Sequence, residues 1–262
     1  MMRYLKLLAI FYKNCLLTDL EYRANFVMNL LTSVFWVGFS LIGIGVFFHQ
    51  RATIGSWNYD EALLVVGLFV LFEGLIDSLF TPNIQRMVEE IRLGTFDFVL
   101  TRPVNSQFLA TLRYFSPWKL ANVAMGAAIC RTALNRLQVS PSLAQLAAGS
   151  ALMASAVVIA YSLWLLMLTT AFWFVRIDNI TELFWAVYET GRFPVSVYPG
   201  WLQGVLSFVI PVAFITTFPA AAVLGKVGAA TVFEGLALAA ALFTASTLFW
   251  RFALRHYSSA SS

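Results

Sequence analysis

Two acidic residues in an otherwise apolar stretch are the side chains whose type and spacing could do chemistry. Glu73 and Asp77 stand four residues apart, so a helix would place both carboxylates on one face. A carboxylate at the centre of a bilayer costs about 2.5–3.5 kcal/mol, so both should point toward protein or water. The pair could line a polar path or gate, or it could be a structural pair that polar groups of neighbouring helices satisfy.

Motifs for other chemistry are absent from the sequence. The two histidines stand far apart in the chain, and Cys15 and Cys130 have no spacing typical of a metal site. Gly225-Lys226 is the closest approach to a phosphate-binding loop, but the Ser or Thr that should follow is missing. We therefore expect no metal or cofactor on this chain and no ATP hydrolysis by it.

The composition is that of a polytopic membrane protein. Of the 262 residues, 60% are hydrophobic and 11% are charged, whereas a soluble domain has about 45–50% apolar and about 25% charged residues. So little polar surface excludes a soluble enzyme and a disordered chain. The net charge of +4 comes from basic residues at the ends of apolar runs, which favours membrane anchoring over nucleic-acid binding.

The apolar runs predict an all-α fold with six membrane-spanning helices, in a single domain over residues 1–262. The six spans are expected at residues 26–48, 62–80, 117–138, 143–175, 201–224 and 229–249. The third crosses only if Lys119 and Arg131 extend to opposite interfaces. Residues 1–24 carry apolar residues at helical spacing with basic residues between them, which indicates an amphipathic helix in the membrane interface or, alternatively, an extension of the first span.

The distribution of basic residues predicts the orientation. Six spans place both termini on one side, and most of the 17 Lys and Arg residues fall on that side or in loops that share it. Basic residues gather on the cytoplasmic side of membrane proteins. We therefore expect both termini in the cytoplasm.

The segment between the second and third spans carries another amphipathic pattern. Thr81 and Pro82 are typical of a helix start and Gly94 of a helix stop. The apolar residues between them form one helical stripe: Ile84, Met87, Val88 and Ile91. On the cytoplasmic face such a helix lies on lipid or docks into a groove on a protein partner. The acidic residues 89–90 weigh against an anionic lipid surface.

Three stretches resemble the permease subunits of bacterial ABC exporters of the type-2 superfamily, in particular the paired six-span permeases encoded beside an ATPase. The run EEIRLGTFDFVLTRPVNSQF, residues 89–108, is similar to the cytoplasmic loop of that family. Its matching residues are Ile91, Arg92, Gly94, Phe96, Asp97, Leu100, Arg102 and Pro103. Residues 191–225 match as well, and the tail from Leu254 matches more weakly.

The resemblance implies a multi-pass transport subunit in the bacterial inner membrane that forms half of a translocation path for export. It implies that residues 82–103 hold a coupling helix seated on a separate ATPase subunit, which would bind ATP and Mg²⁺. It also implies a second permease, either an identical copy or a sister chain. The coupling residues expected on this basis are Ile84, Met87, Val88, Ile91, Arg92, Gly94, Phe96, Asp97, Arg102 and Pro103. For Gly94, Asp97 and Pro103, plain turn chemistry is the alternative.

The fifth and sixth expected spans add further candidates for a path or gate. Pro211 removes a backbone donor and should kink the fifth span. By resemblance, residues 219–228, which begin with Pro219, dip back into the membrane and help to close an outer gate; the alternative is a kinked span and a short loop. Glu234, near the start of the sixth span, is a further candidate.

Two other functions stay open at this point. One is a membrane-embedded channel or scaffold without an energy source. The other is a lipid-modifying membrane enzyme with Glu73 and Asp77 as acid and base, for which the sequence offers no nucleophile and no metal ligands. The leading interpretation is a transport subunit that is not itself an enzyme, contacts membrane lipids and binds no nucleic acid.

Overall fold

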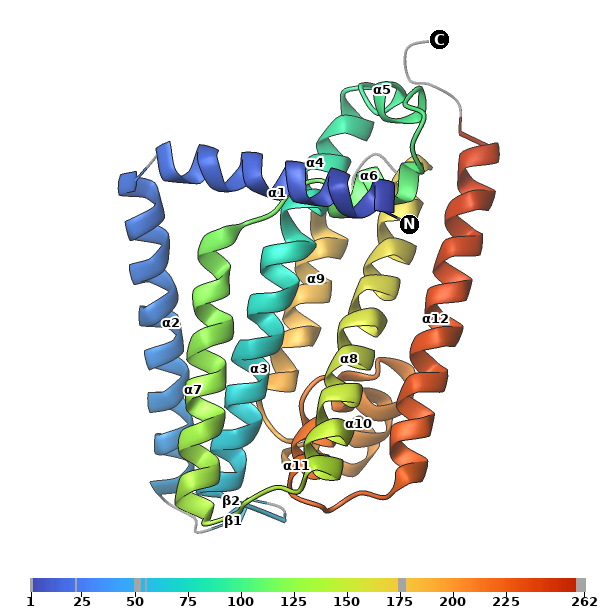
Figure 1. Ribbon diagram of the computed structural model, residues 1–262. Helices are drawn as coiled ribbons and strands as arrows, with labels where there is room; N and C mark the ends of the chain where they lie inside the picture. Colours follow the sequence, from blue (N-terminus) through green and yellow to red (C-terminus); the bar gives the residue numbers. More distant parts are fainter. Residues whose placement is uncertain (1, 22, 50–52, 55, 174–177, 258–262) are drawn as a thin grey trace.

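The computed structural model describes residues 2–21, 23–49, 53–54, 56–173 and 178–257 (Figure 1). This part of the chain is almost entirely helical, which fits the expected all-α membrane fold. Its strands are β1 (Thr53–Ile54) and β2 (Trp57–Asn58), which pair antiparallel in a small hairpin.

Four helices of the described chain are long and apolar enough to cross a membrane. They are α2 (Arg23–His49), α3 (Tyr59–Leu79), α8 (Leu143–Thr169) and α12 (Ala229–Arg255). A bent pair of shorter segments raises the count to five if it is taken as one span. Within the bundle α3 packs against α2 and α7 (Leu120–Leu137), while α8 packs against α12 (Figure 1). The expected number of six spans stays a prediction.

The helices near the expected third and fourth spans differ from them in their bounds. Residues 117–138 form a 3₁₀ turn (Pro117–Lys119) and α7, whose end is marked by Gln138 with a left-handed φ of 54°. A capping box at Ser142 starts α8, which ends at Thr169 and continues as the 3₁₀ turn Thr170–Phe172. Residues 174–175, at the end of the expected fourth span, lie outside the described residues.

Residues 201–224 do not form one continuous helix. They fold as α10 (Gly200–Gly204), a π-helical turn (Val205–Val209), a 3₁₀ turn (Val212–Phe214) and α11 (Thr217–Val223), and the two halves bend by 72°. The break lies at Pro211, which lacks a backbone donor. A separate helix that the sequence did not predict, α9 (Asp178–Glu189), precedes this group.

Helix α1 (Met2–Glu21) lies across one end of the bundle in Figure 1. The same end, here called the α1 end, carries α4 (Thr81–Arg92), α5 (Asp97–Leu100) and α6 (Ser106–Leu112) (Figure 1). The opposite end carries β1 and β2 and is called the hairpin end. Apolar side chains of α1 such as Leu5, Leu17 and Leu20 are exposed, which agrees with a helix that lies in the membrane interface.

Helices α3 and α7 approach each other closely along their backbones. A Cβ added to Gly126 of α7 would lie 2.5 Å from the backbone N of Leu71 and 2.7 Å from the backbone O of Gly67. These atoms belong to the α3 backbone and cannot rotate away. Small residues allow such approaches between membrane helices, where van der Waals packing replaces the hydrophobic effect as the driving force.

We predict that Gly126→Ala lowers the stability of the folded chain by about 1–3 kcal/mol, because the added methyl group pushes α7 away from α3. The measurement is thermal unfolding in detergent. The control is Gly43→Ala in α2, where a Cβ meets nothing within 4 Å. If both variants and the unaltered chain unfold at the same temperature, the close approach of α3 and α7 does not contribute to stability.

Candidate functional site

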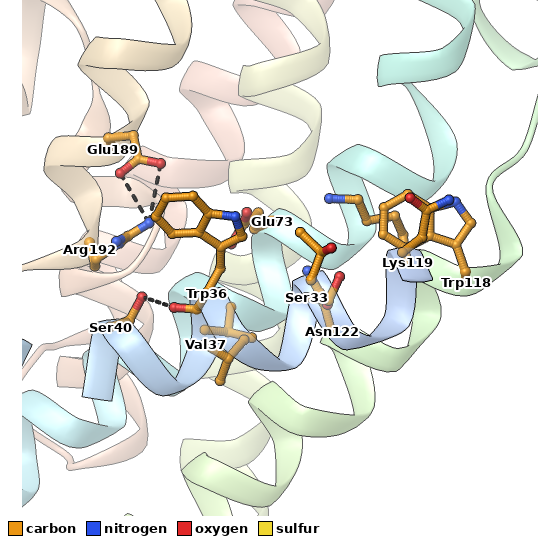
Figure 2. Close-up of a pocket in the computed structure, with 13 residues that line it drawn as sticks. Ser33, Trp36, Val37, Ser40, Glu73, Trp118, Lys119, Asn122, Glu189 and Arg192 are labelled. Atoms are coloured by element: carbon orange, nitrogen blue, oxygen red, sulfur yellow. Dashed lines mark hydrogen bonds and ion pairs between the residues drawn. The ribbon is translucent and has the colours of Figure 1, made fainter. Parts of the chain in front are cut away.

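A polar cleft lies in the bundle between α2, α3, the start of α7 and the end of α9. Its volume is about 370 Å³. Figure 2 shows side chains from each of these elements around it. The polar and aromatic residues that line it are Asn29, Thr32, Ser33, Trp36, Ser40, Glu73, Trp118, Lys119, Asn122, Glu189 and Arg192. Several charged groups therefore share one cleft among membrane helices.

An ion pair joins Lys119, which lines the cleft, to Asp77 of α3. The Lys119 Nζ contacts the Asp77 carboxylate, and the side chains are only 19% and 11% exposed. The other carboxylate oxygen of Asp77 accepts a hydrogen bond of 2.9 Å from Thr81 Oγ1, the first residue of α4. Asp77 therefore links Lys119 in the cleft to the first residue of α4.

A second ion pair lies on the opposite wall. The Arg192 guanidinium contacts the Glu189 carboxylate at 3.0 Å and lies 5.3 Å from the centroid of the Phe69 ring, at the middle of α3. Glu73 lies between Arg192 and Lys119 in Figure 2, close enough to interact with the charges of both ion pairs. Lys119, Asp77 and Arg192, whose side chains are poorly exposed, each have a partner of opposite sign, as burial in a medium of low dielectric constant requires.

Sequence reasoning placed some of these residues and missed others. The structure brings Glu73 and Asp77 to one side of α3, as their spacing predicts. Lys119 pairs with Asp77, a contact that the sequence did not predict, and its expected place at an interface stays a prediction. Glu189 and Arg192 were not singled out. Their spacing of three residues next to an apolar stretch was the available signal, but nothing local showed that they face α3.

The other expected path or gate residues lie outside the cleft. Pro211 and Pro219 are buried in the group at the hairpin end. Glu234 lies near the start of α12 and is exposed. The structure does not bring these three residues together with Glu73, and their expected roles stay predictions.

The apolar stripe of α4 faces the core of this chain. Ile84 is buried and Met87 is almost fully buried, while Val88 and Ile91 pack against the same core. Phe96, beyond the helix, is fully buried. The bundle of this chain therefore covers the side chains of Ile84, Met87 and Phe96, and the coupling role expected of these residues stays a prediction.

The outward surface of this loop is made by other residues. Leu93 is 62% exposed and Phe98 is 69% exposed, although both are large and apolar. Gly94 between them has a φ of 69°, and the backbone N–H groups of Thr95 and Phe96 donate to the carbonyl of Glu90. The turn requires a residue with a left-handed φ, a conformation that glycine adopts without steric cost. Two exposed apolar side chains at its sides were not singled out from the sequence.

The end of the expected coupling segment contacts α1. Arg92 and Arg102 are exposed, and the carbonyl of Pro103 accepts a hydrogen bond of 3.2 Å from the Arg3 guanidinium. A backbone carbonyl makes this contact, so it needs no particular side chain at residue 103. The partner-binding roles predicted for these residues stay predictions.

Phe96 ties the loop to the ends of two long helices. Its ring lies 5.5 Å from that of Phe172, after α8, and 6.1 Å from those of Trp250 and Tyr257, at the end of α12. Burial raises the pKa of Tyr257, and the adjacent Asp97 raises it further through a hydrogen bond and its charge. A displacement of this loop would therefore reach α8 and α12 directly.

We predict that Asp77→Asn destabilises the chain by about 3 kcal/mol, since Lys119 is left without its partner in a poorly solvated site. The variant Lys119→Met should be comparably destabilised. The double variant removes both charges. Its loss of stability should therefore be smaller than the sum of the losses of the two single variants. Strictly additive losses in thermal unfolding would show that the two residues do not depend on each other.

Comparisons with known proteins agree with the resemblance noted above. Neither the curated proteins nor the solved structures contain a match to this chain. Among the described residues, no group of three His, Cys, Asp or Glu side chains could hold a metal ion. The family described as ABC-2 family transporter protein matches residues 34–261, which is most of the chain. The chain therefore belongs to the ABC-2 family of membrane transporter proteins.

Proposed function

We propose that this chain is the membrane subunit of an ATP-driven exporter and works with a separate ATPase subunit. The observation that carries the proposal is the cleft in which Glu73 lies between two ion pairs. A packed structural bundle has little use for such costly charges, whereas a path for polar or charged groups needs them. Family membership supports transport, and the missing phosphate-binding loop leaves ATP and Mg²⁺ to the partner.

The cleft forms half of the translocation path. It is small for a cargo and is bordered by the exposed ring of Trp36. Lipid tails cannot satisfy the charges in it. A second permease, identical or a sister chain, would cover it and supply the other wall.

The loop between α3 and α7 couples the two subunits. Leu93 and Phe98 form an exposed apolar pair next to charged residues of α4, and such a surface suits a groove on a protein partner. The α1 end then faces the cytoplasm, where the ATPase lies, and the chain is in a bacterial inner membrane.

Two sets of contacts would carry motion away from the loop. Phe96 connects it to the ends of α8 and α12. Thr81 connects α4 to Asp77 and hence to Lys119 in the cleft. A tilt of α4 would therefore disturb an ion pair of the path, which gives the ATPase a physical route to the cargo site.

The group formed by α10 and α11 would act as the outer gate. Pro211 breaks it and Pro219 lies within α11, so the chain turns back at the hairpin end. Lys226 fastens this group to α3 through an ion pair of 2.7 Å with Glu61. Irregular backbone is tolerated at membrane depth where protein surrounds it. Most residues of α11 are buried in this chain.

We predict that the double variant Leu93→Glu/Phe98→Glu loses the ATPase subunit on co-purification while it still inserts and folds. Both side chains are exposed, so the exchange costs the permease little, whereas two carboxylates in an apolar interface cost the complex several kcal/mol. The measurement is the ratio of ATPase to permease after purification in detergent.

The matched control is Leu143→Glu, an exposed leucine at the hairpin end. It should keep the ATPase. Loss of the ATPase in both variants would indicate a general defect. If the unaltered chain never co-purifies with a nucleotide-binding subunit, the proposed function itself is wrong.

We predict that a cysteine in the cleft reacts with a charged, water-soluble thiol reagent. Cys15→Ser and Cys130→Ala provide the background without other thiols. In this background, Thr32→Cys places a thiol in the wall of the cleft. It should react much faster than Leu31→Cys, because Leu31 is exposed but does not line the cleft. The measurement is the labelling rate in vesicles with and without ATP. Equal rates at both positions would contradict a water-filled path here.

A further inference from the structure

A second polar cleft lies outside the path, between α1 and the loop that joins α6 to α7. Its volume is about 520 Å³. Helix α1 contributes one face of side chains to it, including Asn14, Thr18 and Asp19, and the opposite wall carries Arg86 and Arg113. Neither arginine belongs to the cargo cleft or to the aromatic contacts of Phe96.

The two guanidinium groups are gathered around one aromatic ring. Arg86 lies 5.3 Å and Arg113 lies 5.0 Å from the centroid of Tyr114. Cation–π contacts of this kind contribute about 0.5–1 kcal/mol at exposed sites, which does not abolish the repulsion between two positive charges. No carboxylate of the described residues lies within 4.0 Å of either guanidinium. Glu90 lies one turn further along α4, but it forms no ion pair with Arg86.

Buried hydrogen bonds hold the ring between the arginines. Asn83 is almost fully buried, and its amide donates to the carbonyl of Tyr114 at 2.7 Å. In return its side-chain oxygen accepts from the Tyr114 backbone N–H at 2.7 Å. The backbone N–H of Ser116 donates to the carbonyl of Ser78. The cationic wall is therefore fixed to the junction of α3 and α4.

We propose that this cleft binds the phosphate group of an anionic membrane phospholipid. Two guanidinium groups match the charge and the acceptor oxygens of a phosphodiester. A lipid is the source because α1, which forms the other wall, exposes Leu16, Leu17 and Leu20 and lies across one end of the bundle (Figure 1). An amphipathic helix in this position is expected to lie among lipid headgroups.

Asp19 refines the choice of headgroup. Its carboxylate lines the same cleft, and burial raises its pKa. It would repel a second negative charge but can accept hydrogen bonds from hydroxyl groups. A glycerol headgroup on a single phosphate meets both demands, so phosphatidylglycerol is the expected ligand. Because Arg86 belongs to α4, the bound lipid would brace the helix that carries the coupling loop.

The test titrates the full-length chain in detergent with phosphatidylglycerol or phosphatidylcholine and follows its thermal unfolding. Phosphatidylglycerol should raise the melting temperature and phosphatidylcholine should not. In Arg86→Gln/Arg113→Gln, the half-maximal concentration of phosphatidylglycerol should rise by about thirtyfold, as expected for two basic contacts. Arg86→Lys/Arg113→Lys should recover much of the effect, which a loss of folding would not allow.

A matched control removes the same charge elsewhere. Lys6 and Lys13 are exposed on α1 and do not line the cleft, so Lys6→Gln/Lys13→Gln should bind nearly as the unaltered chain does. An equal loss in this control would show only general attraction to an anionic surface and would overturn the site. Equal stabilisation by both lipids would overturn it too. Full competition by inorganic phosphate at millimolar concentration would point to a soluble anion instead of a lipid.

Discussion

The need to neutralise charge inside an apolar bundle is the constraint on which the rest of this structure depends. Only 11% of the residues are charged, and several of these lie among membrane helices, where an unpaired charge is expensive. Lys119 and Asp77 neutralise each other's charge. Their pairing holds the start of α7 against the end of α3, and the approach of Gly126 to the α3 backbone continues the same contact along the helices.

The junction between α3 and α4 joins three features of the molecule. Asp77 and Thr81 connect the polar cleft beside α3 to the first turn of α4. Asn83, two residues further, fixes the wall that carries Tyr114 and its two arginines. A small segment thus lies within reach of the proposed path, the coupling loop and the lipid site. Movement of α4 would disturb both the polar cleft and the wall that carries the two arginines, because hydrogen bonds of Thr81 and Asn83 hold them to this helix.

The amphipathic pattern of α4 shows how the same residues allow two structures. A stripe of apolar residues on a short helix can face a partner or face its own chain, and the periodicity is identical in both cases. Here Ile84 and Met87 complete the core. The surface left for a partner is made by Leu93 and Phe98, on both sides of the turn at Gly94. They lie outside the helical stripe, so periodicity could not identify them.

The sequence by itself determined the all-α membrane class, the four long apolar helices and the helical α4, because composition and periodicity are local properties. It also predicted that Glu73 and Asp77 share a helix face. Only the tertiary structure decided that Lys119 and Arg192 approach them, since these residues are far apart in the chain. The same holds for residues 201–224, whose hydropathy is that of a span. Pro211 permits a break there, but the bend of 72° between the two halves and the packing of α11 against α8 are seen only in the tertiary structure.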